Sequence, residues 1–167
     1  MGVRFMGNKI DQFKQAMGNY PTGVSVVTAY NEEDVPMGLT INSFASVSLN
    51  PTLILWSIDN SVSTYDDFQK VERFSINILA SDQGELCQLF ASRVEDRFAN
   101  CEWEKSDLEL PVLKDTMATL QCKVHNRVEA GDHMIMIGEV LEITNSDKEP
   151  LLYHKRHFGQ IPETFYQ

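Results

Sequence analysis

Residues 118–143, ATLQCKVHNRVEAGDHMIMIGEVLEI, carry the strongest strand signal in the chain. From Ala118 to Val128, apolar or small residues alternate with polar ones, and Asn126 is the exception on the apolar side. A period of two is typical of a half-buried strand. Residues 130–133, AGDH, can form a turn, and residues 134–143 then return as a partner strand. The stretch therefore predicts a long β-hairpin.

Other segments extend this β pattern along the chain. We expect strands at residues 24–30, 38–44, 46–49, 53–58 and 74–79, because these are rich in β-branched and aromatic residues. Residues 9–20, capped by Asn8, and residues 81–91 predict short helices, and Ser63 can cap a third. We expect residues 93–116 to be a loop with a turn of helix. Six or seven closely spaced strands favour an antiparallel barrel or sandwich over βαβ units.

Composition limits the class of protein. The 167 residues are 43% hydrophobic, which suits one compact domain spanning residues 1–167. With 14 Lys and Arg against 24 Asp and Glu, the net charge is −10. So acidic a chain, with no basic stripe, argues against binding nucleic acid or an anionic membrane surface.

The sequence also indicates a cytoplasmic location. The uncharged stretch 35–58 holds too many hydroxyls and amides to cross a bilayer. Residues 1–6, MGVRFM, match neither a secretory leader nor a myristoylation signal. Cys87, Cys101 and Cys122 are odd in number and have no CxxC spacing, so we expect buried, inert thiols rather than disulfides or a zinc site.

Ordinary catalytic constellations are absent from the sequence. It holds no HExxH, GxSxG, GxGxxG or P-loop pattern, and its four histidines lack the spacing of a metal site. We therefore expect no metal and no nucleophile–base pair. If the protein is an enzyme, a cofactor supplies its chemistry.

The segment 38–51, GLTINSFASVSLNP, places neutral polar groups at alternate positions. Thr40 and Asn42 would share one strand face, and Ser46 and Ser48 another. Such groups can meet the carbonyl and ring-nitrogen edges of a flat heterocycle. They also suit a plain solvent-exposed strand face rich in hydroxyls, and the residues alone leave both interpretations open.

Residues 38–58, GLTINSFASVSLNPTLILWSI, resemble the central motif of the flavin reductase-like family. Its members are small NAD(P)H:flavin reductases that supply reduced flavin to two-component monooxygenases. Four further segments resemble the family in the same order: PTGVSVVTA, FSINILASDQGELCQLFA, EAGDHMIMIGEV and PLLYHKRHF. The resemblance covers nearly the whole chain. It implies a mainly β, Greek-key split barrel with a few short flanking helices, a homodimer, and FMN or FAD near the dimer interface.

The resemblance also implies the flavin-binding residues. The set that would hold the isoalloxazine edge comprises Thr40, Ile41, Asn42, Ser43, Phe44, Ser46 and Val47. The flavin phosphate would lie near Ser61, Val62 and Ser63, where some relatives carry lysine, so hydroxyls and the N–H groups of a helix start would replace that charge. Further flavin contacts would come from Phe90, Ala91, Ser92 and Arg93. Phe90 is equally well explained as a core residue.

Two more segments match parts of the family that approach the nicotinamide nucleotide. His133 lies in the Gly-Asp-His hairpin and would face the nicotinamide. The C-terminal set comprises Lys155, Arg156, His157 and Phe158, which also fits a simple basic surface patch. A pyrophosphate would be a suitable partner for these cations.

The implied reaction is hydride transfer from NADH or NADPH to FMN or FAD. No side chain has to gain or lose a proton in that step, so we assign no catalytic side chain, and binding and orientation of the rings carry the rate. Two alternatives remain from the sequence. One is a flavin-binding or electron-transfer protein of the same fold without reductase activity. The other is a split-barrel protein for haem, with His125 or His133 as ligand, or for a pyridoxal phosphate-like group.

Overall fold

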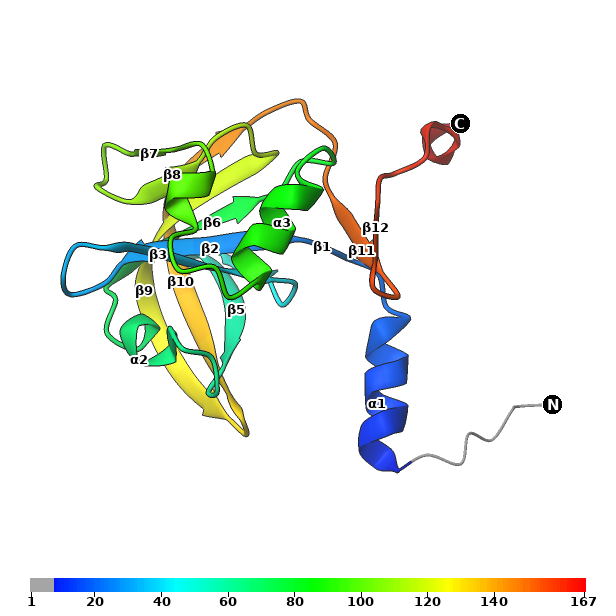
Figure 1. The fold of residues 1–167 in the computed structure, drawn as a ribbon, viewed down its shortest axis with the longest axis horizontal. Helices are drawn as coiled ribbons and strands as arrows, with labels where there is room; N and C mark the ends of the chain where they lie inside the picture. Colours follow the sequence, from blue (N-terminus) through cyan, green and yellow to red (C-terminus); the bar gives the residue numbers. More distant parts are fainter. Residues whose placement is uncertain (1–7) are drawn as a thin grey trace.

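A computed structural model describes residues 8–167 (Figure 1), so the expectation about a leader at residues 1–6 lies outside the described part. The main sheet has seven antiparallel strands in the order β3-β2-β6-β9-β10-β5-β4. Their bounds are β2 Ser25–Tyr30, β3 Pro36–Ile41, β4 Ala45–Leu49, β5 Thr52–Asp59, β6 Arg73–Ile78, β9 Ala118–Ala130 and β10 His133–Asn145. The predicted strands are all present.

The main sheet curves around an apolar interior but does not close. β3 and β4 are its two edges and do not pair with each other within residues 8–167. The predicted mainly β split barrel is therefore confirmed. Its open edges matter for function, because an edge strand presents N–H and C=O groups without a strand partner.

The hairpin of β9 and β10 forms the longest part of the sheet, with 13 residues in each strand. Its register shifts between Ile137 and Gly138 and again between Val140 and Glu142. Gly138 makes room for a core ring, since a Cβ at this position would lie 2.5 Å from Cζ of Phe74. The hairpin predicted from the alternating pattern is confirmed and is slightly longer than expected.

The barrel interior is apolar and tightly packed. Trp56 is fully buried, and its ring meets Phe68 and Phe74 edge to face, with centroids 5.3 and 5.7 Å apart. Met136 of β10 is also fully buried in this cluster. Burial alternates along β5 and β10, because every second side chain packs into this interior.

The opposite face of β2, β6 and β9 is buried as well, but it is polar. The side chain of Asn77 donates to the carbonyl of Val26 and to Thr28 Oγ1, both at 3.0 Å, and accepts from the N–H of Leu113 at 2.9 Å. Leu113 belongs to the short hairpin of β7 Trp103–Lys105 and β8 Pro111–Leu113, which covers this face. We expected only loop and a helical turn here, so the hairpin corrects that expectation, while the turn of helix is present at η1 Phe98–Asn100.

A second apolar cluster lies beneath helix α3, Gly84–Ala91. Phe90 is 1% exposed there, and its ring packs edge to face on Phe98 with centroids 5.2 Å apart. Cys87 is buried in the same cluster, and burial raises the pKa of its thiol. Burial also raises the pKa of Cys122 to about 12. All three cysteines are free thiols, and Cys87 and Cys122 are buried as expected, whereas Cys101 is only half-buried.

The flanking helices differ in detail from the prediction. Helix α1, Lys9–Gly18, begins with Asn8 as expected, because Asn8 Oδ1 accepts from the N–H of Asp11 at 2.9 Å. Helix α2, Tyr65–Phe68, has only four residues, and its N-cap is Thr64 without a side-chain bond, so the prediction of a Ser63 cap is wrong. Helix α3 begins at Gly84 instead of Ser81, because Gln83 uses its side chain to accept from the N–H of Ala80.

A small sheet connects the two ends of the described chain. It consists of β1 Thr22–Gly23, β11 Leu152–His154 and β12 His157–Gly159, followed by η2 Glu163–Tyr166. Figure 1 shows α1 below this sheet and apart from the barrel. Between residues 8 and 167, no helix combines the length and the apolar character needed to cross a membrane.

Candidate functional site

Several predicted site residues come together around the end of β5, a region that we call the site end. β5 finishes there at Asp59 and β10 begins there at His133, while Ser43, in the connection that follows β3, is bonded to Ser57 of β5. The register pairs His133 with Asp59, and the N–H of Asn60 donates to the carbonyl of Asp132 at 3.0 Å. The turn of the long hairpin is thus fixed to the end of β5.

The connection from β3 to β4 brings Asn42, Ser43 and Phe44 to the site end. Ser43 Oγ donates to the carbonyl of Ser57 at 3.2 Å and accepts from its N–H at 3.0 Å, so this hydroxyl ties the connection to β5. Phe44 packs partly buried against the barrel core. Asn42 is exposed, and its side chain makes no hydrogen bond within residues 8–167. Of these polar groups, the Asn42 amide is the one available to a ligand.

Thr40 and Ile41 belong to the scaffold. Thr40 Oγ1 donates to the carbonyl of Cys87 at 2.7 Å and so fastens β3 to α3. Ile41 is 6% exposed and faces the barrel core. We expected Thr40 and Asn42 to share one strand face, but β3 ends at Ile41, so Asn42 already lies in the connection.

Ser46 and Val47 lie on β4, the exposed edge of the sheet. Its pairing with β5 shifts between Ser46 and Ser48, so Val47 bulges out and is 48% exposed. Because β4 pairs with β5 on one side only, backbone groups on its other side have no strand partner in the described part of the chain. These groups and the Ser46 hydroxyl form a neutral row of donors and acceptors.

Ser61, Val62 and Ser63 follow β5 at the same end. The N–H of Ser61 donates to Asp59 Oδ1 at 2.7 Å. This bond, then one from the Ser61 hydroxyl and a smaller effect of His133, holds the pKa of the Asp59 carboxyl below its usual value. Val62 packs on the core, while Ser61 and Ser63 are exposed. Asp59 was not predicted, although a strand end followed by Asn-Ser is a recognisable Asx-turn signal.

His133 is half-buried, with 41% of its side chain exposed. Its Nδ1 lies 2.7 Å from Asp132 Oδ1. The carboxylate thereby fixes the ring orientation and leaves Nε2 for another partner. A ligand at this part of the site end would therefore meet ionisable side chains, those of Asp132, Asp59 and His133.

The predicted contacts at the end of α3 lie along β3 rather than at Asn42. Phe90 is buried, as its interpretation as a core residue expects. Ala91 and Arg93 are exposed, and Ser92 Oγ donates to the carbonyl of Leu89. Arg97, which no sequence signal indicated, donates to the carbonyls of Gly38 and Ser92 and holds this loop on β3.

The C-terminal set is not brought to the site end within one chain. Lys155 and Arg156 form the β11–β12 turn with φ of 49° and 65°, and the N–H of Lys155 donates to the carbonyl of Gly18. His157 Nδ1 lies 2.8 Å from the carbonyl of Lys155, and Phe158 packs near Tyr153. These residues extend from β1 and α1, and the strands of the site end do not pair with them (Figure 1).

The site end fits the chemistry of a flavin ring. A flat heterocycle with several carbonyl and nitrogen positions needs neutral donors and acceptors at an accessible edge. The Asn42 amide, the Ser46 hydroxyl and the open edge of β4 supply them. A nucleophile or a general base is not needed for such binding.

Comparison with known proteins identifies the family. A model described as "Flavin reductase like domain" matches residues 17–162. The FMN reductase (NADH) SmoA of Agrobacterium fabrum is 40% identical over 155 residues, which is 93% of this chain and 88% of SmoA. The NADH:FAD oxidoreductase SgcE6 of Streptomyces globisporus, solved with NAD and FAD fragments, superposes with a TM-score of 0.90 at 29% identity, covering 97% of this chain and 98% of SgcE6.

A further relative is the reductase component of the flavin-dependent trigonelline monooxygenase of Acinetobacter baylyi, 41% identical over 148 residues. The match takes in 89% of this chain, but the chain spans only about half, 48%, of that relative's length. The chain belongs to the flavin reductase-like family, so the resemblance found in the sequence is confirmed. Relatives with an enzyme name, such as the FMN reductase SmoA and the NADH:FAD oxidoreductase SgcE6, are oxidoreductases.

Proposed function

We propose that this member of the flavin reductase-like family is an NAD(P)H-dependent flavin reductase that binds FMN or FAD at the site end. The observation that carries the proposal is the exposed Asn42 amide, next to Ser43, which is bonded to β5, and in the connection that leads to the open edge strand β4. Relatives named as an NADH-dependent FMN reductase and an NADH:FAD oxidoreductase support it. The expected cytoplasmic location is part of the same proposal.

Each group at the site end has a role in this proposal. The bound flavin supplies the ring that accepts a hydride from the nicotinamide. Asn42, Ser46 and the β4 backbone hold its polar edge, and donors there favour the charge of the reduced ring. Ser61 and Ser63 lie near the phosphate, and His133 seats the nicotinamide. The protein accelerates the reaction by bringing two rings together in the right orientation.

A steady-state assay tests the reductase activity. Purified protein is mixed with NADH or NADPH, with and without added FMN or FAD, and nicotinamide oxidation is followed by absorbance. We expect oxidation that depends on flavin, and the preferred pair identifies both nucleotides. Flavin binding without any oxidation would instead favour the electron-transfer alternative, and a haem-type spectrum would contradict both.

We further propose a homodimer, with flavin held between two copies. Helix α1 presents an apolar face that nothing covers within residues 8–167, with Ile10 62%, Phe13 65% and Met17 50% exposed. A second copy of the chain would bury it. The basic β11–β12 turn, which extends away from its own barrel, would then be available to a site shared by both copies.

The dimer is tested by light scattering with and without flavin. We expect the parent protein to have twice the mass of one chain. Phe13→Glu should lower this mass toward that of the monomer and should weaken flavin binding at the same time. A parent protein that is monomeric yet binds flavin at micromolar affinity would exclude a shared site.

We also propose a monooxygenase as the consumer of the reduced flavin. Relatives named as reductase components or subunits of monooxygenases support this part. The class of reaction that follows would use reduced flavin and O₂ on a separate protein.

A further inference from the structure

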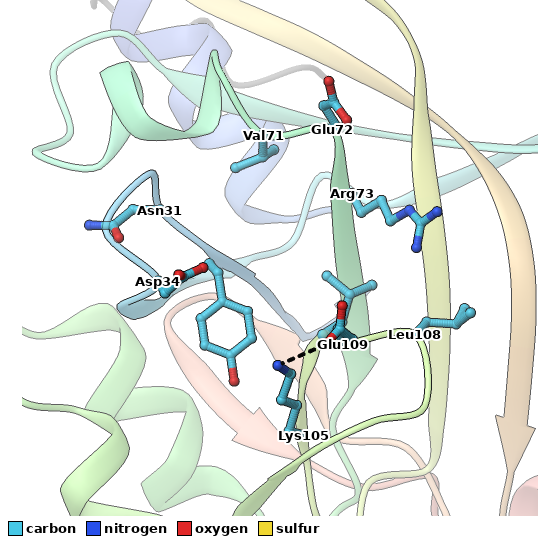
Figure 2. A pocket seen from close by; sticks show the side chains of 10 residues that line it. Asn31, Asp34, Val71, Glu72, Arg73, Lys105, Leu108 and Glu109 are labelled. Carbon is cyan, nitrogen blue, oxygen red and sulfur yellow. Dashed lines mark hydrogen bonds and ion pairs between the residues drawn. The ribbon is translucent and has the colours of Figure 1, made fainter.

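A cavity of about 680 Å³ lies where β2 finishes at Tyr30 and β6 begins at Arg73 (Figure 2). β3 finishes at the other end of β2, because Ile41 pairs with Ser25. Three segments far apart in the sequence line this open cavity: residues 30–34, residues 71–73 and residues 105–110. The proposed flavin site does not include any of these segments.

The two loops at the cavity are closed by internal hydrogen bonds. In the β2–β3 turn, the N–H of Asn31 donates to the carbonyl of Val35 at 3.0 Å, and Asn31 Oδ1 accepts from the N–H of Val35 at 2.9 Å. In the β7–β8 turn, the N–H of Ser106 donates to the carbonyl of Leu110 at 2.9 Å, and Ser106 Oγ donates to Gln121 Oε1. The walls are thus formed without a ligand, as is usual for small-molecule sites.

The lining combines an aromatic ring and aliphatic side chains with charges of both signs. Tyr30, Val71, Leu108 and Leu110 supply the apolar part. Lys105 Nζ lies 3.1 Å from Glu109 Oε1 and 5.7 Å from the centroid of the Tyr30 ring, so this lysine is already paired inside the cavity.

Three charged side chains remain after that internal pairing. Asp34, Glu72 and Arg73 line the cavity, stand at separate places around it (Figure 2), and form no ion pair within residues 8–167. A ligand with only a negative charge would meet the two carboxylates. A ligand with only a positive charge would leave the guanidinium of Arg73 unused and close to it.

We propose that this cavity binds a small zwitterion with an aromatic or apolar body. Its carboxylate would pair with the guanidinium of Arg73, which can hold a carboxylate through two parallel hydrogen bonds. Its ammonium would lie between Asp34 and Glu72, and its body would contact Tyr30 and Leu110. This charge pattern gives specificity for a zwitterion. An analogue with only the carboxylate would lie near Asp34 and Glu72 without an ammonium to pair with them, and an analogue with only the ammonium would lie near Arg73 without a carboxylate.

Three probes of similar size test this assignment on the full chain. Amide shifts of ¹⁵N-labelled protein are followed during titration with L-phenylalanine, 3-phenylpropionate, which lacks the ammonium, and phenethylamine, which lacks the carboxylate. We expect L-phenylalanine to shift residues 30–34, 71–73 and 105–110 and to bind about tenfold more tightly than either analogue. Equal binding of an analogue, or no shift of these residues at about 20 mM probe, would overturn the proposal.

Matched variants locate the binding. Arg73→Gln should weaken L-phenylalanine binding about tenfold and remove its advantage over phenethylamine. Asp34→Asn, which suits the left-handed φ of 59° at this position, should weaken it while sparing 3-phenylpropionate. Lys14→Gln, at an exposed position of helix α1, is the control and should change nothing. Unaltered binding in Arg73→Gln would contradict the assignment, and because no flavin or nicotinamide is present, the result is independent of the proposed reductase activity.

Discussion

Two polar regions of the molecule make a useful comparison: the buried network around Asn77 and the site end around Asn42. Both lie on strands or at strand ends, and both contain an asparagine among hydroxyl-bearing residues. Asn77 is fully buried, and both its amide oxygen and its amide nitrogen are bonded within the chain. Asn42 is exposed and makes no side-chain hydrogen bond within residues 8–167. A polar side chain alone therefore does not indicate a binding site. A polar side chain whose donors and acceptors have no partner within the described chain does.

The same distinction separates neighbours inside one segment. Thr40 and Ser43 have hydroxyls that bond to the carbonyls of Cys87 and Ser57, so they hold the scaffold together. Asn42 and Ser46 lie between and beyond them with exposed side chains. Substitutions in the two groups should consequently separate effects on folding from effects on binding.

The largest effect is expected for Asn77→Leu. The substitution leaves the buried N–H of Leu113 and the carbonyl of Val26 without their side-chain partner, which costs about 2–4 kcal/mol of unfolding free energy. Urea unfolding followed by circular dichroism measures it as a lower midpoint at an unchanged slope. Flavin affinity per folded molecule should remain that of the parent, so a selective loss of flavin binding would break the comparison.

Asn42→Leu should show the opposite pattern. We expect flavin affinity to fall by about 1–3 kcal/mol, or roughly ten- to hundredfold, because polar atoms of the ring lose their partner. The unfolding midpoint should stay close to that of the parent, since Asn42 makes no internal bond. Fluorescence titration of flavin gives the affinity. A folded variant with the parent's affinity would remove Asn42 from the site.

His133→Ala should affect the nicotinamide and spare the flavin. We expect kcat/KM for the nicotinamide to fall about tenfold, which corresponds to roughly 1.4 kcal/mol of transition-state binding. Asp132→Asn provides a graded comparison, because it keeps the shape of the side chain and removes the carboxylate 2.7 Å from Nδ1. Weakened flavin binding with unchanged nicotinamide kinetics would assign His133 to the flavin instead.

The smallest effect is expected for Thr40→Val, which removes one hydrogen bond between β3 and α3. It should lower the unfolding free energy by about 0.5–1.5 kcal/mol and leave flavin affinity unchanged. Together with Asn42→Leu two positions away, this variant compares a polar side chain that is hydrogen-bonded within the chain with one that is not. A tenfold loss of flavin affinity in Thr40→Val would show that its hydroxyl leaves Cys87 to meet the ligand.

Much of the fold could be predicted because a barrel interior imposes a period of two on its strands. That pattern located the hairpin of β9 and β10, and the β-branched and aromatic composition located β5 and β6. It missed β7 and β8, whose three-residue strands are too short to show a period. It also placed Thr119 and Gln121 on a polar outer face, yet both are buried, because the β7–β8 hairpin and residue Thr116 cover them and supply hydrogen bonds.

The candidate site was predictable in part. Its segments came from the family resemblance, but which hydroxyls remain available depends on contacts between residues far apart in sequence. Thr40 bonds 47 residues away and Arg97 bonds 59 residues away, and no local pattern reports such partners. Asp59 and Asp132 come close together because β5 pairs with β10 in a particular register, and that register is defined only in the folded sheet.

The most direct measurement is stopped-flow mixing of the flavin-loaded protein with NADH or NADPH under anaerobic conditions, recording flavin absorbance near its visible maximum. The account predicts rapid bleaching with at least one nicotinamide nucleotide in the parent, and bleaching about tenfold slower at limiting nicotinamide in His133→Ala. Flavin that stays oxidised with both nucleotides in the parent would contradict the assignment of this chain as a flavin reductase.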